Sequence, residues 1–474
     1  MIILDYLMWF FGGLIIIYML LVIVTYGLMF FFALLKLRKE YRLDQTEMDE
    51  TYIDAFYSKP VSVIIPAYNE EVGIVDSIHS LLSLHYPEFE IIMVNDGSTD
   101  RTQEIVIEQF QMKKIEKVIK MEIPASPIIQ IYQSQIHPNC FLVEKENGGK
   151  ADALNVGINV AKYPYFCSVD GDSILESTSL LRLMKPIALS DGEVIAAGGN
   201  VQIANGMNMQ LGSILETNLS KNYLVTMQII EYFRAFLIGR ITLSKFNLVL
   251  IISGAFSVFS KKWVVEAGGY TKSMIGEDME LVVKLHRYIR KKKENKRIEF
   301  VENPVCWTEA PETMAVLRRQ RRRWHQGLLE SLWNHKTMTL NPRYGGIGLL
   351  SFPYFWLVEG LGPIIELGGY IYIVCAFFLG DIYYEIAILL LLTFVLYGVV
   401  FSMMAVLFEA WSKNKTFKVA DLIRMMLLSF TEIFWYRPIT LIWRCEGLLN
   451  FLVRRREWGK MDRKGISSKE QESI

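Results

Sequence analysis

Neither sign of charge is in excess in this sequence, and its few cysteines form no recognisable pattern. Lysine and arginine together number 50 and are balanced by 50 aspartates and glutamates. A protein that binds nucleic acid over its surface would carry a basic excess, so the balance argues against that class. The five cysteines form no CxxC pair, which gives neither a disulfide framework nor a zinc-binding spacing and predicts reduced thiols.

Two common phosphate-binding patterns are missing as well. No GxGxxG follows the first predicted strand, and no GxxxxGK[ST] occurs anywhere. A dinucleotide-binding fold or a P-loop is therefore unsupported, and a nucleotide would have to be held in another way.

Apolar residues, in contrast, are abundant. They make up 52% of the 474 residues, charged residues make up 21%, and the mean hydropathy is +0.25. Such a chain is too apolar to be disordered. At this length the composition predicts membrane spans beside a water-facing domain.

The first apolar run, Leu7–Leu35, contains no charged residue. A helix over it, at about 1.5 Å per residue, exceeds the roughly 30 Å hydrocarbon core of a bilayer. The run is too long for a cleaved signal peptide, and no basic region precedes it. Because basic residues follow it, we expect a transmembrane helix over 1–35, with its N-terminus outside, and a polar linker over 36–60.

Residues 337–453 are expected to form interfacial and transmembrane helices, with apolar stretches between 344 and 408. Charged residues interrupt the apolar segment 420–453. We predict two half-length helices that meet near Tyr436–Pro438, with their charges facing protein or a wet cavity. The alternative is an amphipathic helix on the membrane surface. The basic tail, 454–474, is expected to be cytoplasmic.

Between these segments, residues 61–336 alternate short apolar runs with helical patterns, which predicts an α/β domain with a mostly parallel sheet. Ligands bind at the carboxyl ends of such strands. Each of four predicted strands ends in a polar or acidic loop, and this recurrence indicates a nucleotide site. The strands are Val61–Ile65, Ile91–Val94, Phe141–Val143 and Tyr165–Val169.

Asp170 and Asp172 directly follow the fourth of these strands. In extended backbone, residues two apart point the same way, so both carboxylates can address one hard cation bound to a diphosphate. An isolated DxD often only caps a turn, but this one lies behind the Asp96 and Lys150 loops. Lys150 is expected to neutralise phosphate or to pack over a base, the alternative being a solvated lysine at a helix start.

An acidic loop, Gly276-Glu277-Asp278, opens an amphipathic helix. Asp278 is the candidate general base for an acceptor hydroxyl, and Glu277 is expected to orient the loop. The alternative is that these acids only favour the helix N-terminus. Upstream, the stretch Tyr232–Asn247 either lines an acceptor path or docks on lipid, and the sequence leaves both open.

A strongly basic helical stretch, Leu317–Trp333, brings Gln320, Arg323 and Trp324 onto one face. Arginine pairs with phosphate in a bidentate manner, and an indole can stack on the apolar face of a sugar. The alternative is a basic interfacial helix without chemistry. The other arginines of the stretch are expected to contact lipid headgroups; they are Arg318, Arg319, Arg321 and Arg322.

Taken together, six motifs occur in an order that resembles the processive family 2 membrane glycosyltransferases. That group includes the cellulose, chitin, hyaluronan and poly-N-acetylglucosamine synthases. The resemblance covers roughly residues 60–340 and the arrangement of flanking spans. The motifs are Val63-Ile-Ile-Pro-Ala-Tyr-Asn-Glu70, Val94-Asn-Asp-Gly-Ser-Thr-Asp100, Asn147-Gly-Gly-Lys-Ala151, Asp170-Gly-Asp172, Gly276-Glu-Asp278 and Gln320-x-x-Arg-Trp324.

The resemblance implies a GT-A fold that binds a UDP-sugar with Mg²⁺ or Mn²⁺ on the cytoplasmic face of the plasma membrane. It implies that Asp170 contacts the nucleotide, that Asp172 holds the metal, and that Asp278 is the base of an inverting transfer. Gln320, Arg323 and Trp324 would hold the acceptor end near the leaving diphosphate, and the membrane helices would form an export channel. Residues implied to contact uridine or diphosphate are Ala67, Tyr68, Glu70, Asp96 and Lys150.

This sequence departs from the family pattern in two respects. Its base loop reads Gly-Glu-Asp, where cellulose synthases have Thr-Glu-Asp and hyaluronan synthases Gly-Asp-Asp, so the motif does not identify the sugar. A single span precedes the catalytic domain, a layout most similar to the poly-N-acetylglucosamine branch. We expect no cyclic-dinucleotide-binding domain after residue 453, so control of that kind would need an accessory or regulatory subunit.

The leading hypothesis is a processive, inverting synthase that uses UDP-N-acetylglucosamine or UDP-glucose and exports a β-linked polymer. The first alternative is a non-processive transferase that moves one sugar to a lipid-phosphate carrier, which leaves the Gln320-x-x-Arg-Trp324 motif unexplained. The second is a scaffold subunit with an inactive nucleotide fold, which would be expected to lose its carboxylates.

Overall fold

The computed structural model describes residues 2–44, 59–210, 213–379, 384–411 and 417–455. Most of the expected linker at 36–60 and nearly all of the expected basic tail at 454–474 lie outside these residues. The five cysteines are free thiols, as the sequence predicts.

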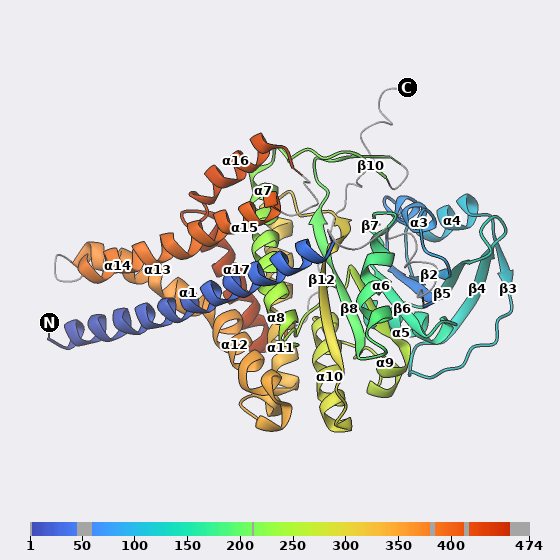
Figure 1. Ribbon diagram of the computed structural model, residues 1–474, viewed down its shortest axis with the longest axis horizontal. Helices are drawn as coiled ribbons and strands as arrows, with labels where there is room; N and C mark the ends of the chain where they lie inside the picture. The colour runs from blue at the N-terminus through green and yellow to red at the C-terminus, as the bar shows by residue number, and fades with distance from the viewer. Residues whose placement is uncertain (1, 45–58, 211–212, 380–383, 412–416, 456–474) are drawn as a thin grey trace.

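Three helical segments within the described residues are long and apolar enough to cross a membrane: Tyr6–Lys36, Ile347–Phe378 and Tyr384–Trp411. The first belongs to α1 (Ile2–Asp44), a single continuous helix. In Figure 1, α1 extends away from the α/β domain together with α13 (Gly362–Leu379) and α14 (Tyr384–Val395).

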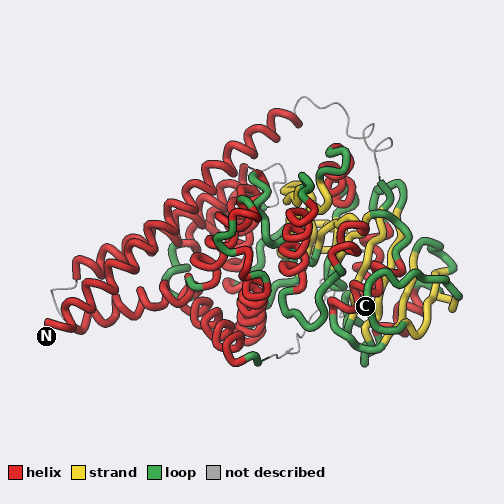
Figure 2. The backbone as a smooth tube through the Cα atoms, turned by 90° about the horizontal axis from the view of Figure 1, so that it is seen from below, coloured by secondary structure: helices red, strands yellow, loops and turns green. Residues whose placement is uncertain are grey.

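These helices pack through an apolar cluster of their own. Met19 and Val22 of α1 are fully buried together with Ala376 of α13 and Leu390 of α14. Gly12 permits a close approach, because a Cβ there would lie 2.8 Å from the side chain of Ile386. Figure 2 shows the same helices side by side from a second direction.

The α/β domain is built on a ten-stranded mixed sheet with the order β3-β4-β5-β2-β1-β6-β11-β8-β12-β7. The four predicted strands form its centre and pair in parallel, as expected. Antiparallel pairings extend the sheet on both sides. The sequence predicted none of the flanking strands, which are β3, β4, β7, β8, β11 and β12. The strands are β1 (Val61–Ala67), β2 (Phe89–Asp96), β3 (Met112–Ile115), β4 (Ile128–Ser134), β5 (Cys140–Lys145), β6 (Tyr165–Val169), β7 (Ile174–Leu175), β8 (Val194–Ile203), β11 (Phe256–Ser260) and β12 (Arg297–Thr308), with β9 (Asn208–Gln210) and β10 (Ser213–Glu216) forming a separate pair.

The central strands are buried on both faces, which explains their unbroken β-branched runs. Along β1, Val63 and Ile65 join the core on one face, whereas Ile64 joins the core on the other. Helix α5 covers the second face closely, because a Cβ at Gly157 would lie 2.3 Å from Ile64.

Helices cover both faces of the sheet and connect it to the membrane-type segment. In the α/β domain they are α3 (Ile74–Leu82), α4 (Thr102–Gln109), α5 (Lys150–Val160), α6 (Ser179–Leu189), α7 (Tyr223–Phe233), the π-helical η1 (Arg234–Arg240), α8 (Ile241–Lys245), α9 (Lys261–Ala267), α10 (Glu277–Lys292) and α11 (Met314–Asn334). The chain continues through η2 (Lys336–Met338), η3 (Pro342–Tyr344), η4 (Ile347–Ser351), α12 (Phe352–Tyr354), η5 (Phe355–Gly360), α13, α14, η7 (Leu396–Val400), α15 (Phe401–Trp411), α16 (Val419–Ser429) and α17 (Tyr436–Val453).

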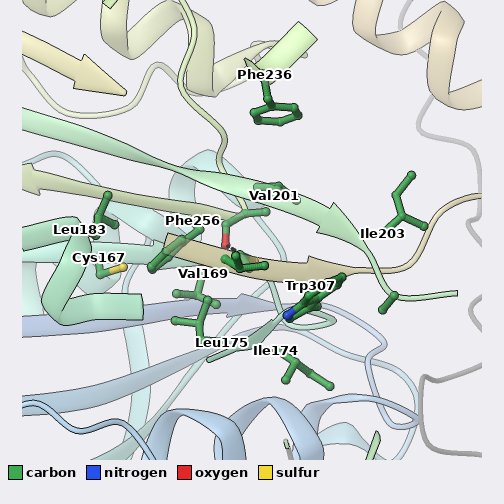
Figure 3. Packing of buried hydrophobic residues seen from close by; sticks show 14 of the residues in the cluster. Cys167, Val169, Ile174, Leu175, Leu183, Val201, Ile203, Phe236, Phe256 and Trp307 are labelled. Atoms are coloured by element: carbon green, nitrogen blue, oxygen red, sulfur yellow. Dashed lines mark hydrogen bonds between the residues drawn. The ribbon is translucent and has the colours of Figure 1, made fainter. Parts of the chain in front are cut away.

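Figure 3 shows the larger core, in which the sheet meets both α6 and η1. Residues from distant parts of the chain contribute to it: Cys167, Val169, Ile174, Leu175, Leu183, Val201, Ile203, Phe236, Phe256 and Trp307. This packing joins η1, which leads toward the membrane-type helices, firmly to the sheet.

The interrupted segment at the C-terminal end consists of two helices, as predicted, but the position of the break differs. Helix α16 ends at Ser429 and α17 begins at Tyr436, so the break precedes the predicted site at Tyr436–Pro438. Pro438 lies in the first turn of α17, where the missing N–H costs no helical hydrogen bond. The proline therefore starts this helix rather than ending one.

Candidate active site

A single cavity of about 2220 Å³ opens at the carboxyl ends of β1, β2 and β6 and extends toward the membrane-type helices. The parallel strands bring their terminal loops to one edge of the sheet, so distant motifs converge there. Every site residue predicted from the sequence lines this cavity: Ala67, Tyr68, Glu70, Asp96, Lys150, Asp170, Asp172, Glu277, Asp278, Gln320, Arg323 and Trp324.

Asp96 is buried at the end of β2, and the chain itself engages its carboxylate. The amides of Gly148 and Gly149 donate hydrogen bonds to it at 2.9 and 2.8 Å, and the Lys145 ammonium makes a short contact with it. Asp96 thereby fixes the loop at the start of α5 that presents Lys150.

Behind this loop lies a buried charge network that the sequence analysis missed. Lys145 is fully buried and also contacts Asp152 Oδ2 at 3.0 Å, while Lys272 reaches Asp152 Oδ1. Burial alone would raise the pKa of Asp152, but hydrogen bonds from Lys272, Ser126 and Lys145 lower it to about 2. The acid is therefore ionised at neutral pH, and the network holds the α5 N-terminus in place.

Lys150 links the acids of the strand loops to the acidic loop of α10. Its Nζ lies 2.8 Å from Asp170 Oδ1, 3.6 Å from Glu277 Oε1 and 3.8 Å from Asp278 Oδ2. Burial would lower the pKa of Lys150, but the three carboxylates outweigh burial and raise it well above its usual value. Lys150 is a charged member of the site rather than a solvated lysine.

Asp278 lies in the first turn of α10 against the backbone of Gly254. Its Oδ1 is buried and accepts no hydrogen bond within the described residues. Burial raises the pKa of Asp278 to about 7, with Lys150 opposing the shift and Glu277 adding to it. A carboxylate with these properties is suited to accept a proton near neutral pH. Gly254, which sequence reasoning missed, leaves the space that this carboxylate occupies.

Asp170 and Asp172 follow the end of β6, and both line the cavity. Among the described residues no group of three or more His, Cys, Asp or Glu side chains gathers as a complete metal site. Two carboxylates nevertheless fit a hard divalent cation such as Mg²⁺, which commonly takes one or two protein carboxylates and completes its shell with substrate phosphates and water.

Helix α11 places Gln320, Arg323 and Trp324 on the cavity wall. The side chain of Thr313 caps this helix by accepting a hydrogen bond from the Val316 amide. Trp324 is 43% exposed although the helix is well packed, which leaves indole surface available to the cavity.

The expectation that Arg321 contacts lipid headgroups is wrong. Arg321 is buried and forms an ion pair with Glu231 of α7 at 2.9 Å, and its guanidinium lies 4.7 Å from the ring centre of Trp324. The basic run in the sequence did not reveal that Arg321 forms an ion pair, because its partner Glu231 lies 90 residues away in the chain.

The stretch Tyr232–Asn247, whose role the sequence left open, forms part of the cavity wall through Tyr232, Arg234, Phe236 and Arg240. The segment from Arg234 to Arg240 is π-helical, a form that is frequent at functional sites. No sequence signal distinguishes a π-helix from an α-helix here.

Comparison with known proteins identifies the class. A model described as glycosyl transferase family 2 matches residues 62–266, and one described as glycosyl transferase family group 2 matches residues 169–433. The second match covers more than half of the chain, so the protein belongs to this family of glycosyltransferases, as its motifs predict.

Two curated relatives indicate the branch to which the chain is similar. A poly-β-1,6-N-acetyl-D-glucosamine synthase of Staphylococcus epidermidis is 31% identical over 280 residues, or 58% of this chain and 57% of that protein. The protein of that name from Staphylococcus aureus strain COL is 29% identical over 338 residues, or 71% of this chain and 69% of that protein. The first match spans little more than half of the relative's length.

Among solved structures, the mannosyltransferase PcManGT from Pyrobaculum calidifontis, in complex with GDP-Man and Mn²⁺, has a similar fold. Its TM-score is 0.52 at 16% identity, and the match covers 93% of this chain and all of that one. The likeness concerns the fold alone and, with the family match, confirms the predicted GT-A architecture.

Proposed function

We propose that this protein is a processive, inverting polysaccharide synthase that polymerises sugar from a UDP-sugar. UDP-N-acetylglucosamine is the first donor to consider, because the similar staphylococcal proteins are named for poly-β-1,6-N-acetyl-D-glucosamine. UDP-glucose is the second. The catalytic α/β domain, 61–336, would face the cytoplasm, and the helices of 337–453 together with α1 would form an export channel in the plasma membrane.

The observation that carries this proposal is the continuity of one cavity. Its wall includes Asp172 and Asp278 of the α/β domain and also Tyr26, Glu366 and Tyr397, one residue from each of the three candidate spans. A space that joins a donor-type site to the interior of a group of membrane-type helices suits an enzyme that moves its product as it makes it.

In the proposed reaction, Asp278 accepts the proton of the acceptor hydroxyl as that oxygen attacks the anomeric carbon of the donor sugar. The new carbon–oxygen bond forms as the bond from the anomeric carbon to the diphosphate breaks, and UDP leaves with the bonding electrons. A single displacement of this kind inverts the anomeric centre. The raised pKa of Asp278 keeps the base poised near the working pH.

Asp172 and Asp170 would hold Mg²⁺ or Mn²⁺ against the donor diphosphate. The cation would neutralise negative charge on the phosphate oxygens. Lys150 and Arg323, which both line the cavity, would add positive charge for the leaving diphosphate. Trp324 would stack on the terminal sugar of the acceptor while Gln320 orients it.

The test is incubation of the detergent-solubilised full-length chain with a panel of UDP-sugars, followed by size and linkage analysis of the product. A polymer from one donor supports the proposal. A product with one sugar on a lipid phosphate would favour the non-processive alternative, and no turnover of any donor would favour an inactive scaffold.

Two variants test the assigned residues separately. Asp278→Asn should abolish polymer while UDP binding survives, and polymer at the wild-type rate would refute the base assignment. Trp324→Ala should shorten the product more than it weakens donor binding. Equal polymer length in that variant would remove the acceptor role of the indole.

A further inference from the structure

The deep part of the cavity contains charged residues that the proposed chemistry does not use. Among these residues are four arginines and four glutamates, and each arginine forms an ion pair with a different glutamate. The pairs are Arg321–Glu231 at 2.9 Å, Arg234–Glu432 at 3.0 Å, Arg437–Glu366 at 2.7 Å and Arg444–Glu359 at 3.2 Å.

These four pairs connect different elements around the cavity. Arg321–Glu231 joins α11 to α7, and Arg234–Glu432 joins η1 to the turn before α17. Helix α17 is joined to α13 by the ion pair of Arg437 and to η5 by the ion pair of Arg444. The glutamates of both pairs belong to the candidate span Ile347–Phe378.

Hydroxyl groups hold two of the glutamates in place. Ser402 of α15 donates a hydrogen bond to Glu432 at 2.6 Å, and Tyr436 donates one to Glu231 at 2.6 Å. Arg437 also lies 4.0 Å from Glu432, so the Arg437–Glu366 pair is continuous with the Arg234–Glu432 pair. These four pairs give this part of the wall equal numbers of positive and negative side chains, set among uncharged lining residues such as Tyr397 and Leu441.

The outer end of the same cavity differs. There acids outnumber the cations Lys150, Arg240 and Arg323; the acids are Glu70, Asp96, Asp170, Asp172, Glu277, Asp278, Glu309 and Glu312. Balanced charge is therefore a property of the deep part rather than of the whole cavity.

Stability alone does not explain four such pairs. Buried ion pairs are often no more stabilising than apolar residues of the same size, and charges between membrane-type helices are costly. Because all eight side chains line a cavity, they give it a wall that can form hydrogen bonds with a polar occupant.

We infer that this balanced wall is a binding surface selective for an electrically neutral saccharide chain. The inference rests on the proposed function, in which the product passes through this space. Hydroxyl and amide groups can bond to the free lone pairs and N–H groups of the ion pairs without disturbing their charge balance. To bind an acidic sugar, an arginine would have to break its ion pair, which would leave the partner glutamate with an uncompensated negative charge. To bind a sugar with a free ammonium group, a glutamate would have to break its ion pair, which would leave the partner arginine uncompensated.

The test measures oligosaccharide binding to the purified full-length chain in lipid nanodiscs, without a donor, by equilibrium dialysis. Three labelled probes of equal length are compared: β-1,6-linked N-acetylglucosamine oligomer, its de-N-acetylated cationic form, and an anionic hyaluronan oligomer. The wild-type chain should bind the neutral probe about tenfold or more tightly than either charged probe. Equal binding of a charged probe would overturn the inference.

Variants of one ion pair give the decisive comparison. Glu366→Gln leaves positive charge in the wall and should shift preference about tenfold toward the anionic probe, whereas Arg437→Gln should shift it toward the cationic probe. The double variant is balanced again and should recover the wild-type preference. Single variants that keep the wild-type preference would contradict the inference.

Controls separate this result from folding and from the proposed function. Glu446→Gln breaks the exposed pair with Arg318, which does not line the cavity, and should leave the probe preference unchanged. If a variant at Glu366 or Arg437 does not fold, Glu359→Gln and Arg444→Gln make the same comparison at a more exposed pair. Donor turnover is measured on the same wild-type sample, so a failure of the synthase proposal is distinguished from a failure of the neutral-chain preference.

Discussion

In the proposed site, the carboxylate of Asp278 packs directly against the backbone of Gly254. A Cβ added to Gly254 would lie 2.0 Å from Asp278 Oδ2, nearer than any real contact permits. The Asp278 side chain can move more easily than the backbone at Gly254. A methyl group at position 254 would therefore displace the proposed base rather than the backbone.

We therefore expect Gly254→Ala to reduce kcat about 100-fold, because displacement of a reacting group by about 1 Å has effects of that order. Its free energy of unfolding should change by only about 1 kcal/mol. Gly368→Ala is the matched control, since nothing lies within 4 Å of a Cβ there. Polymer assays and thermal melts of both variants check this, and full activity in Gly254→Ala would contradict it.

The pH dependence of the rate should also report on Asp278. Because burial raises its pKa to about 7, the base becomes protonated as the pH falls below that value. The kcat/KM for the donor should then decrease about tenfold per pH unit on the acid side. A rate that stays level well below pH 7 would argue against Asp278 as the base.

The free energy of unfolding should depend on pH in the opposite direction to the rate. The pKa of Asp278 is higher in the folded chain than in the unfolded one, so the folded state binds the additional proton between those two values. This contribution to stability is present at lower pH and is lost as the pH rises through the folded pKa. Asp278→Asn should consequently raise the melting temperature at pH 8 while it abolishes polymer formation, and a lowered melting temperature would contradict the account.

At the scale of elements, the crossing of α10 and α11 brings the base loop to the acceptor wall. The two helices meet at Gly276 and Gly327, where a Cβ on Gly327 would lie 2.8 Å from the backbone nitrogen of Gly276. Ser331 supports the same crossing by donating a hydrogen bond to the Gly276 carbonyl at 3.3 Å. Backbone atoms cannot move aside as a side chain can, so the spacing of the helices depends on both glycines.

Gly327→Ala should separate the two helices and cost about 1–3 kcal/mol of folding free energy, as overpacking usually does. Activity should fall more steeply than stability, because Asp278 and Trp324 would move apart. Gly27→Ala, at an uncrowded helix position, is the control. Denaturant titration and product-length analysis measure the two effects, and an unchanged product would show that this crossing does not set the site.

At the scale of the whole molecule, the three candidate spans and the α/β domain imply a definite orientation in the membrane. Basic residues follow the first span, and loops rich in lysine and arginine generally stay on the cytoplasmic side of a membrane. We expect the catalytic domain inside and the exposed start of α14, near Glu385, outside.

In cells expressing a chain with Cys375 and Cys445 replaced by serine, a membrane-impermeant maleimide should label Glu385→Cys from outside. Lys162→Cys, on an exposed loop of the α/β domain, should be labelled only after the membrane is opened. These positions suit the comparison because both native side chains are exposed. Labelling of Lys162→Cys in intact cells would reverse the proposed orientation.

Local pattern was sufficient to predict much of this architecture. The four central strands, the three apolar spans and the acidic loops after the strands all follow from short-range features, because a strand end or an apolar run is visible within a few residues. The flanking strands β3, β4, β7, β8, β11 and β12 were missed, and the break in the C-terminal segment lies just before Tyr436 rather than at Pro438.

The amino-acid pattern alone was enough to predict which segments are apolar enough for a membrane, which loops carry the candidate carboxylates, and which family the chain resembles. The folded arrangement was needed to show that Arg321 pairs with Glu231, that Gly254 makes room for Asp278, and that four ion pairs line the cavity. The physical reason is that charge balance and close packing depend on partners from distant parts of the chain, which meet only when the sheet and the helices have assembled.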